Sequence, residues 1–128
     1  MPAKPWATFR QPDPERDYLV LLTVLPVKCF RDLGAFLLYT WRIAGQLRRT
    51  PGVVGYSLLA HIFQRRFWTL SVWEGEAALQ QFVAAPPHSQ VTRALQEKMG
   101  RTHFVRWNMR GAELPPRWPE ALARQDAA

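Results

Sequence analysis

The sequence predicts an α+β domain of the ferredoxin-like type, two copies of which pack together as a dimeric α+β barrel. Apolar patterns follow one another in the order strand, helix, strand, strand, helix, strand, which is the β-α-β-β-α-β sandwich of that fold. The first predicted strand is apolar on both faces. The chain has 128 residues, of which 48% are hydrophobic, and this length and composition suit one globular domain.

Composition divides the chain into three segments. Residues 1–17 are polar and rich in proline, and we expect an extended N-terminal arm that Trp6 and Phe9 fix to the body. Residues 18–110 contain the predicted ferredoxin-like elements. Residues 111–128 form a second proline-rich tail, in which a short helix is expected near residues 119–124.

The first half of the domain combines one apolar strand with one amphipathic helix. Residues 18–26 form a nearly unbroken apolar run, whose length and β-branched content favour a strand. Residues 30–49 predict a helix because apolar side chains recur every three or four positions, and Pro51 and Gly52 end it. The predicted buried face holds Leu33, Phe36, Leu37, Thr40, Ala44 and Leu47, and the outer side holds mostly Arg31, Arg42, Gln46 and Arg49.

The second half begins with a hairpin. Residues 53–63 and 67–74 are predicted strands around a turn at 64–66. A helix then opens at Gly75, is interrupted at Pro86 and Pro87, and resumes from about residue 88 to residue 99. Residues 103–109 alternate between apolar and polar side chains, as a half-buried edge strand does.

The apolar first strand predicts a homodimer. In this fold the first and third strands are central, and the helices cover only one face of the sheet. The other face is also apolar here, and a large exposed apolar patch is rare on a monomer. We therefore expect the same face of a second copy to cover it by two-fold symmetry.

Net charge, cysteine content and hydropathy indicate whether nucleic acid or a membrane is a partner and which compartment to expect. The net charge is +7, and arginine supplies all but three of the 17 basic residues. The arginines are scattered and no RNA-binding signature is present, so we expect a solvated basic surface and no nucleic-acid partner. Cys29 is the only cysteine, and no apolar run approaches the roughly 20 residues that span a bilayer. We expect a soluble cytoplasmic protein without a membrane partner.

Motifs of other enzyme classes are missing from the sequence. Three dispersed histidines and one cysteine match no zinc pattern, so no metal site is predicted. No phosphate loop, nucleophile elbow or dinucleotide fingerprint occurs. His61 and His103 are expected to be ordinary strand residues, and Glu74 and Glu76 to be structural residues at a strand–helix junction.

One stretch resembles a known family. Residues 67–74, Phe-Trp-Thr-Leu-Ser-Val-Trp-Glu, are followed by Ala77, Ala78, Leu79, Phe82 and His88. This pattern resembles the antibiotic-biosynthesis-monooxygenase superfamily of dimeric α+β barrels over about residues 18–110. The resemblance implies a cofactor-independent oxygenase, a haem-dependent oxygenase or a member without known activity.

The haem-degrading branch differs from this chain at its functional positions. That branch carries an asparagine in the first strand, a tryptophan in the helix after the Trp-Glu junction and a haem-ligating histidine about ten residues later. Here the first strand has no asparagine, Phe82 stands at the tryptophan position and an ungapped count places Thr92 at the ligand position. His88 lies four residues earlier, so haem stays an alternative only through a different geometry.

His88 is the candidate catalytic residue. Its place at a helix start predicts a lowered pKa, and a neutral imidazole can accept a proton or ligate iron. The simpler alternative is a histidine that packs or caps at the helix boundary.

A second set of residues is the candidate substrate-binding surface. Phe67, Thr69, Ser71 and Trp73 alternate on one face of the third strand, opposite the apolar Trp68, Leu70 and Val72. We expect the apolar set to face the helices and the mixed set to face the barrel interior, where aromatic walls with two hydroxyls suit a flat organic ligand. The alternative is that the mixed set fills the dimer core.

Two functional hypotheses follow. The first is a small-molecule-binding dimeric barrel with monooxygenase activity on an aromatic or polyene substrate. If this activity is cofactor-independent, the substrate itself must supply the redox chemistry. The second is a non-catalytic binding or structural homodimer, or a haem-binding protein. A cavity that reaches His88 favours the first, and a packed interior favours the second.

Overall fold

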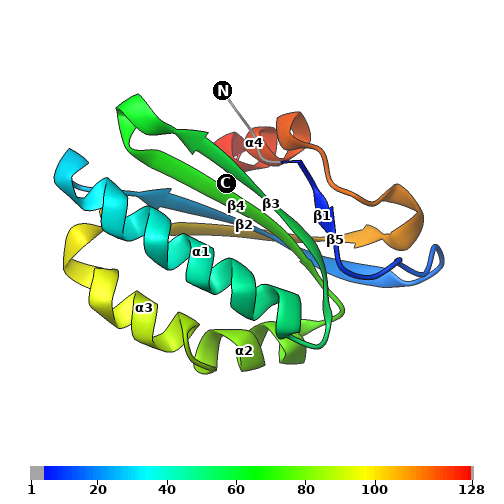
Figure 1. Cartoon of the computed structure of the whole chain (residues 1–128). Coiled ribbons are helices and arrows are strands. Elements are labelled where there is room, and N and C mark those ends of the chain that lie inside the picture. Colours follow the sequence, from blue (N-terminus) through cyan, green and yellow to red (C-terminus); the bar gives the residue numbers. More distant parts are fainter. Residues whose placement is uncertain (1–4, 128) are drawn as a thin grey trace.

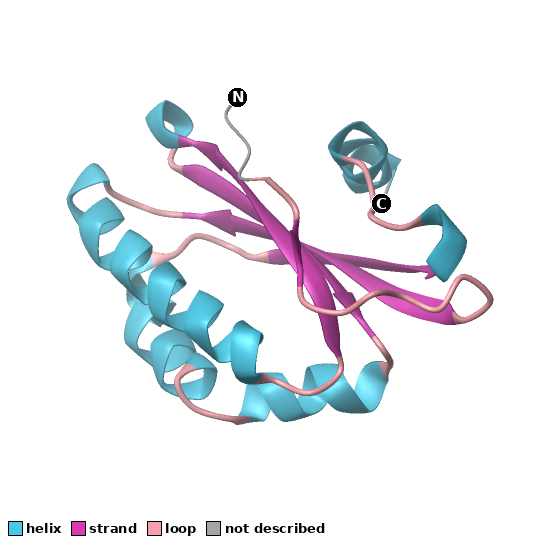
Figure 2. Cartoon of the chain, turned by 45° about the vertical axis from the view of Figure 1, so that its right-hand side comes forward, coloured by secondary structure: helices cyan, strands magenta, loops and turns pink. Residues whose placement is uncertain are grey.

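One antiparallel sheet forms the centre of the protein, with its strands in the order β1-β3-β4-β2-β5. The computed structural model describes residues 5–127, so the first four residues of the predicted arm and the last residue of the tail lie outside the described residues. Helices α1, α2 and α3 lie on one side of the sheet and α4 lies on the other (Figures 1 and 2). Within residues 5–127, no helix is both long and apolar enough to cross a membrane.

The elements follow the predicted α+β order, with additions at both ends. The strands are β1 (Ala7–Thr8), β2 (Asp17–Pro26), β3 (Val53–His61), β4 (Arg66–Trp73) and β5 (His103–Arg110). The α-helices are α1 (Leu33–Arg49), α2 (Glu76–Ala84), α3 (His88–Leu95) and α4 (Trp118–Ala127). Short 3-10 turns precede α1 at Phe30–Asp32, follow β3 at Ile62–Gln64, follow α3 at Gln96–Lys98 and follow β5 at Gly111–Glu113.

The two central strands are those predicted from the sequence. Leu22 of β2 pairs with Leu70 of β4 on one side and with Val105 of β5 on the other. The last strand, β5, is an edge as predicted, and its side chains alternate between half-buried and exposed. On the opposite side β1 pairs with β3, where Ala7 lies opposite Tyr56, so the hairpin strand β3 is not an edge.

Helices α1 to α3 cover one face of the sheet. Their side chains pack with Leu21, Tyr56 and Trp73 in one cluster and with Phe67 in a second cluster further along the sheet. Leu37, predicted to be buried, is 45% exposed. The apolar pattern of α1 is wider than the stripe that contacts the sheet, and Leu37 lies outside that stripe.

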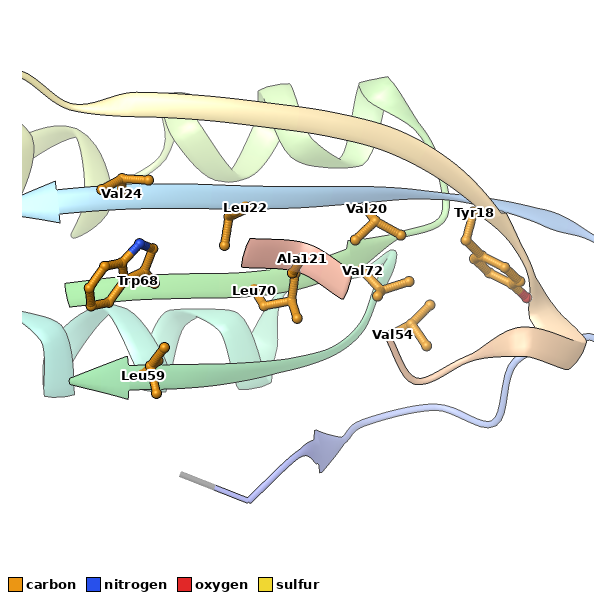
Figure 3. Packing of buried hydrophobic residues seen from close by; sticks show 10 residues of the cluster. All are labelled: Tyr18, Val20, Leu22, Val24, Val54, Leu59, Trp68, Leu70, Val72 and Ala121. Carbon is orange, nitrogen blue, oxygen red and sulfur yellow. The ribbon is translucent and has the colours of Figure 1, made fainter. Parts of the chain in front are cut away.

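The opposite face is covered by the C-terminal segment of the same chain. Val20, Leu22 and Leu70 are completely buried there, together with Ala121 of α4 (Figure 3). Two hydrogen bonds hold α4 in place: the indole nitrogen of Trp118 donates to Ser57 Oγ at 3.1 Å, and that of Trp68 donates to Gln125 Oε1 at 2.9 Å.

This cover overturns the premise of the dimer prediction. The sequence argument assumed that only a second copy could cover the apolar outer face of the sheet, whereas α4 of the predicted tail lies on it (Figure 2). Trp6 of the N-terminal arm and Leu122 of α4 pack against the same cluster.

Candidate functional site

The mixed face of β4 points toward α1–α3, and the prediction that it faces away from the helices was wrong. Trp73 packs with Leu79 and Phe82 of α2, and Phe67 packs with Phe36 of α1. The apolar set, Trp68, Leu70 and Val72, instead lies in the cluster that contains Ala121 of α4. The chain buries both faces of β4, so polarity along the strand did not reveal which helices each face meets.

Three of the five predicted site residues are connected through a residue that was not predicted to act. The indole nitrogen of Trp73 donates a 2.8 Å hydrogen bond to Ser71 Oγ. The Trp73 ring lies 5.2 Å from the Phe82 ring, and the Phe82 ring lies 4.9 Å from the imidazole of His88. Ser71, Trp73, Phe82 and His88 thus form one continuous row, which we call the Ser71–His88 row.

Phe67 and Thr69 lie elsewhere on β4. Phe67 and Trp73 are six positions apart along the strand, which corresponds to about 20 Å. Phe67 is completely buried, and its ring lies 4.5 Å from the ring of Phe36. Thr69 is half-buried between Thr23 of β2 and Leu58 of β3 in the strand register. The structure therefore does not join these two residues to His88.

His88 begins α3 and is held by its neighbours. Its Nδ1 lies 3.3 Å from the carbonyl oxygen of Val83 and 3.4 Å from Thr92 Oγ1. Burial lowers the pKa of His88 below its ordinary value of 6.5, and the hydrogen bond to Val83 opposes part of that change. The direction agrees with the sequence-based expectation, although burial rather than the helix N-terminus is the main cause.

The protonation of His88 follows from these contacts. A neutral imidazole donates from one nitrogen and accepts at the other. Because a carbonyl only accepts, the contact with Val83 assigns the proton to Nδ1. Nε2 is then the acceptor, and a neutral histidine with that tautomer can take a proton from a weak acid.

Gln46 of α1 fixes the junction between α2 and α3, and the sequence analysis placed it wrongly on the outer side. Its side chain is buried. Its Nε2 donates to the carbonyl oxygens of Phe82 and Ala85 at 3.0 and 3.3 Å, and its Oε1 accepts from the backbone N–H of His88 at 2.8 Å. Little in the sequence indicated this role. Helical periodicity identifies the side of α1 that packs on the sheet, whereas Gln46 contacts the α2–α3 junction.

Two adjoining grooves lie between α1 and this junction. The larger, of about 560 Å³, is lined by Trp41, Arg42, Gly45, Arg48, Arg49, Pro86, Pro87 and Gln90, and we call it the Trp41 groove. The smaller, of about 320 Å³, is lined by Gln46, Arg49, Thr50, Pro51, Gln81, Phe82, Ala85 and Pro86, and we call it the Phe82 groove. Arg49 and Pro86 line both grooves, and no residue of β4 lines either.

The other two histidines and the two junction carboxylates of the sequence analysis lie outside these grooves. His61 ends β3 and His103 begins β5, both at strand ends as expected. Glu74 forms an ion pair of 2.7 Å with Arg10, and Glu76 forms one of 2.8 Å with Arg106. These surface pairs agree with a structural role for both carboxylates.

Whether the site fits a haem depends on the surroundings of His88. Within residues 5–127, no three His, Cys, Asp or Glu side chains gather as a metal site requires. A haem iron needs open access to an imidazole nitrogen, whereas His88 packs against Phe82 and lines neither groove. Thr92, at the position of the family's haem ligand, has a hydroxyl that donates to the carbonyl of His88 at 2.8 Å. These surroundings do not fit a haem, and we derive no step through it.

Comparison with known proteins reveals similar solved structures. No family model matches the chain, and no curated protein matches its sequence. A Nitrosomonas europaea protein proposed to be an antibiotic biosynthesis monooxygenase superposes with a TM-score of 0.66 at 16% identity, over 72% of this chain and 89% of that one. SnoaB, a cofactor-independent oxygenase from Streptomyces nogalater, gives a TM-score of 0.57 at 17% identity, over 80% of this chain and 98% of SnoaB.

The chain has the antibiotic-biosynthesis-monooxygenase-like fold. A protein from Shewanella oneidensis shares it too, with a TM-score of 0.65 at 15% identity over 81% of this chain and 96% of that one. The resemblance inferred from residues 67–88 is therefore confirmed for the fold. In this monooxygenase-like fold the two grooves lie on the helical side, beside the Ser71–His88 row.

Proposed function

We propose that this chain binds a planar aromatic or polyene molecule in the two grooves between α1 and the α2–α3 junction. The observation that carries the proposal is the position of Phe82. This residue lines the Phe82 groove, and its ring contacts both Trp73 and His88. A ligand in the groove therefore touches the row that contains three of the predicted site residues.

The dimensions and walls of the grooves support this binding. Pockets of about 300 to 1,000 Å³ hold most small organic ligands. The two grooves fall within that range and adjoin at Arg49 and Pro86. Trp41 is 73% exposed and provides a flat aromatic surface on which a planar molecule can stack.

The enzymatic form of the proposal is a monooxygenase-like reaction with His88 as the base. The fold contains at least one cofactor-independent oxygenase, SnoaB. Without a cofactor, the deprotonated substrate itself must supply the electrons that reduce O₂. A neutral His88 with Nε2 as acceptor is suited to remove the substrate proton, and Phe82 is the residue that lies in contact with both His88 and the Phe82 groove.

A non-catalytic binding protein is the second candidate, and the packing of β4 favours it. Trp73 is 1% exposed and its indole nitrogen is already bound to Ser71. Neither groove reaches Ser71 or Thr69, so these hydroxyls meet no ligand in the observed arrangement. Oxygen uptake with a planar, easily deprotonated ketone such as anthrone separates the candidates, because only the enzyme consumes O₂ and loses this activity in His88→Ala.

The predicted homodimer and the cytoplasmic location stay proposals. Because α4 packs on the outer sheet face, where Val20, Leu22 and Leu70 are buried, a dimer through this face either includes α4 in its interface or displaces it. The location rests on the sequence alone.

Nuclear magnetic resonance tests the binding proposal directly. In the ¹⁵N-labelled chain, titration with anthrone is expected to shift the indole signal of Trp41 and the backbone signals of Ala85 and His88. Trp107 and Trp118 pack against the cluster that contains α4, so their indole signals are the internal control. Shifts confined to Trp107 and Trp118, or no saturable shift with any planar compound, would contradict the proposal.

A further inference from the structure

We infer that the Trp41 groove selects a planar aromatic carboxylate, whose ring lies on Trp41 and whose carboxylate binds Arg42, Arg48 and Arg49. This inference deepens the proposed function and rests on it, because it assigns a ligand class to the same pair of grooves. Helix α1 presents the side chains that would bind this ligand.

The groove residues of α1 share one side of the helix. At 100° per residue, positions 41, 42, 45, 48 and 49 fall within a sector of about 120°. All five line the Trp41 groove. Three arginines and one tryptophan therefore line a single concavity, which a scattered set of surface arginines would not do.

These arginines have no acidic partner in the part of the chain that the structure describes. The ion pairs found there involve other basic residues; Arg10 and Arg16, for example, share Glu74 on another part of the surface. The sequence explains why the groove arginines lack an acidic partner nearby, because no Asp or Glu occurs in residues 33–73 or in residues 77–96. The elements on both sides of the groove thus lack the carboxylates that would neutralise it, and an anion would supply the missing charge.

Trp41 adds the preference for a flat ring. Its side chain is 73% exposed although it lines a concave surface. A Cβ atom added to Gly45 would meet no atom within 4 Å, so the floor beside Trp41 is open. Pro86 and Pro87 form an uncharged opposite wall. An aromatic ring between these walls would bury apolar area on both of its faces.

A carboxylate fits the arginines better than a neutral polar group does. Guanidinium and carboxylate form charge-assisted, often bidentate hydrogen bonds. The groove volume of about 560 Å³ suits one small molecule. A nucleic acid would need a longer basic track, and on the sheet side Arg106 and Arg110 are paired with Glu76 and Asp17.

Calorimetry on the full-length chain compares 2-naphthoate with 2-naphthalenemethanol, which has the same ring system without the charge. The inference predicts that naphthoate binds about tenfold more tightly or better, as charge-assisted hydrogen bonds require. The double variant Arg42→Gln/Arg49→Gln is expected to remove this preference by weakening naphthoate far more than the alcohol. Arg93→Gln is the matched control, since Arg93 is exposed on α3 and lines neither groove. Trp41→Ala is expected to weaken both ligands.

The contrary outcomes separate this inference from the proposed function. Equal binding of naphthoate and the alcohol, unaffected by the double variant, would overturn the carboxylate preference and leave the binding function intact. No binding of either compound would overturn both. Tighter binding of inorganic phosphate or of a single-stranded oligonucleotide than of naphthoate, insensitive to Trp41→Ala, would overturn the inference in favour of a general anion surface.

Discussion

The Oε1 atom of Gln46 accepts a 2.8 Å hydrogen bond from the backbone N–H of His88, so the longest helix of the fold fixes the first residue of α3. The amide nitrogen of the same side chain holds the carbonyl oxygens of Phe82 and Ala85. One buried side chain therefore sets the position of both aromatic partners in the Phe82–His88 contact.

Replacement of Gln46 should destabilise the fold. Gln46→Ala leaves the backbone N–H of His88 without its partner and takes one of two hydrogen bonds from each of the carbonyl groups of Phe82 and Ala85, so the expected cost is about 2 kcal/mol of unfolding free energy. Urea denaturation followed by far-ultraviolet circular dichroism measures it. Gln90→Ala is the control because Gln90 is exposed on α3, and its effect should stay within about 0.5 kcal/mol. Equal effects of the two substitutions would show that the Gln46 hydrogen bonds contribute nothing net.

Ser71 is expected to act on stability and not on ligand binding. Ser71→Ala removes the acceptor of the Trp73 indole N–H, which is buried, and the expected loss is about 1 to 3 kcal/mol. Because Ser71 lines neither groove, the affinity for a planar ligand should be unchanged. An unchanged stability together with weaker ligand binding would instead restore Ser71 to the substrate-binding role predicted from the sequence.

The sequence predicted the order of elements well because each one has a local signal. The apolar run of β2 and the helical spacing in α1 depend only on neighbours in the chain. The faces of β4 could not be assigned in this way, since their neighbours Leu47 and Ala121 are remote in sequence. A helix was expected in the tail, but its docking on the sheet depends on tertiary contacts such as that between Trp68 and Gln125.

The residues of the candidate site could likewise be predicted only where they have a local signal in the sequence. His88 and Trp73 could be chosen by residue type and by the family resemblance, and the structure connects them through Phe82. Gln46 and the groove arginines gave no motif, because their role comes from the packing of α1 beside the α2–α3 junction. The open surface lies on α1, whereas the sequence placed it on β4.

Helix α4 should keep the outer face of the sheet from associating. Ala121 is completely buried against that face, so Ala121→Glu forces a charge into an apolar contact and is expected to release α4. If α4 takes the place of a second copy, light scattering gives about 14.8 kDa for the unaltered chain and a larger mass for this variant. Ala123→Glu, at an exposed position of the same helix, is the matched control and should behave as the unaltered chain.

The opposite result would have an equally definite meaning. If the unaltered chain already has twice the monomer mass and Ala121→Glu becomes monomeric, the outer face with α4 in place takes part in a dimer. The homodimer predicted from the sequence would then stand, with α4 as part of its interface.

His88 should make stability depend on pH below neutrality. Its pKa in the folded chain is lowered from 6.5 by burial, so the unfolded chain binds a proton more readily. Its contribution to stability is fully present above pH 6.5 and is lost as the pH falls through the lower folded-state value. Urea midpoints between pH 7.5 and 5 should therefore decline less in His88→Gln. His103→Gln, on the exposed start of β5, should retain the decline. Parallel curves for all three proteins would contradict the assignment.

The most direct test of the account is to fill the Trp41 groove from its own floor. Gly45→Leu places a side chain in open space inside the groove, and Gly34→Leu does the same at an exposed position of α1 outside it. Titration with a planar aromatic ligand should show affinity weakened about tenfold or more in Gly45→Leu and unchanged in Gly34→Leu, because only the former occupies the ligand's volume. Equal affinities in the two variants, with both folded, would show that the ligand binds elsewhere and that the grooves are not the functional site.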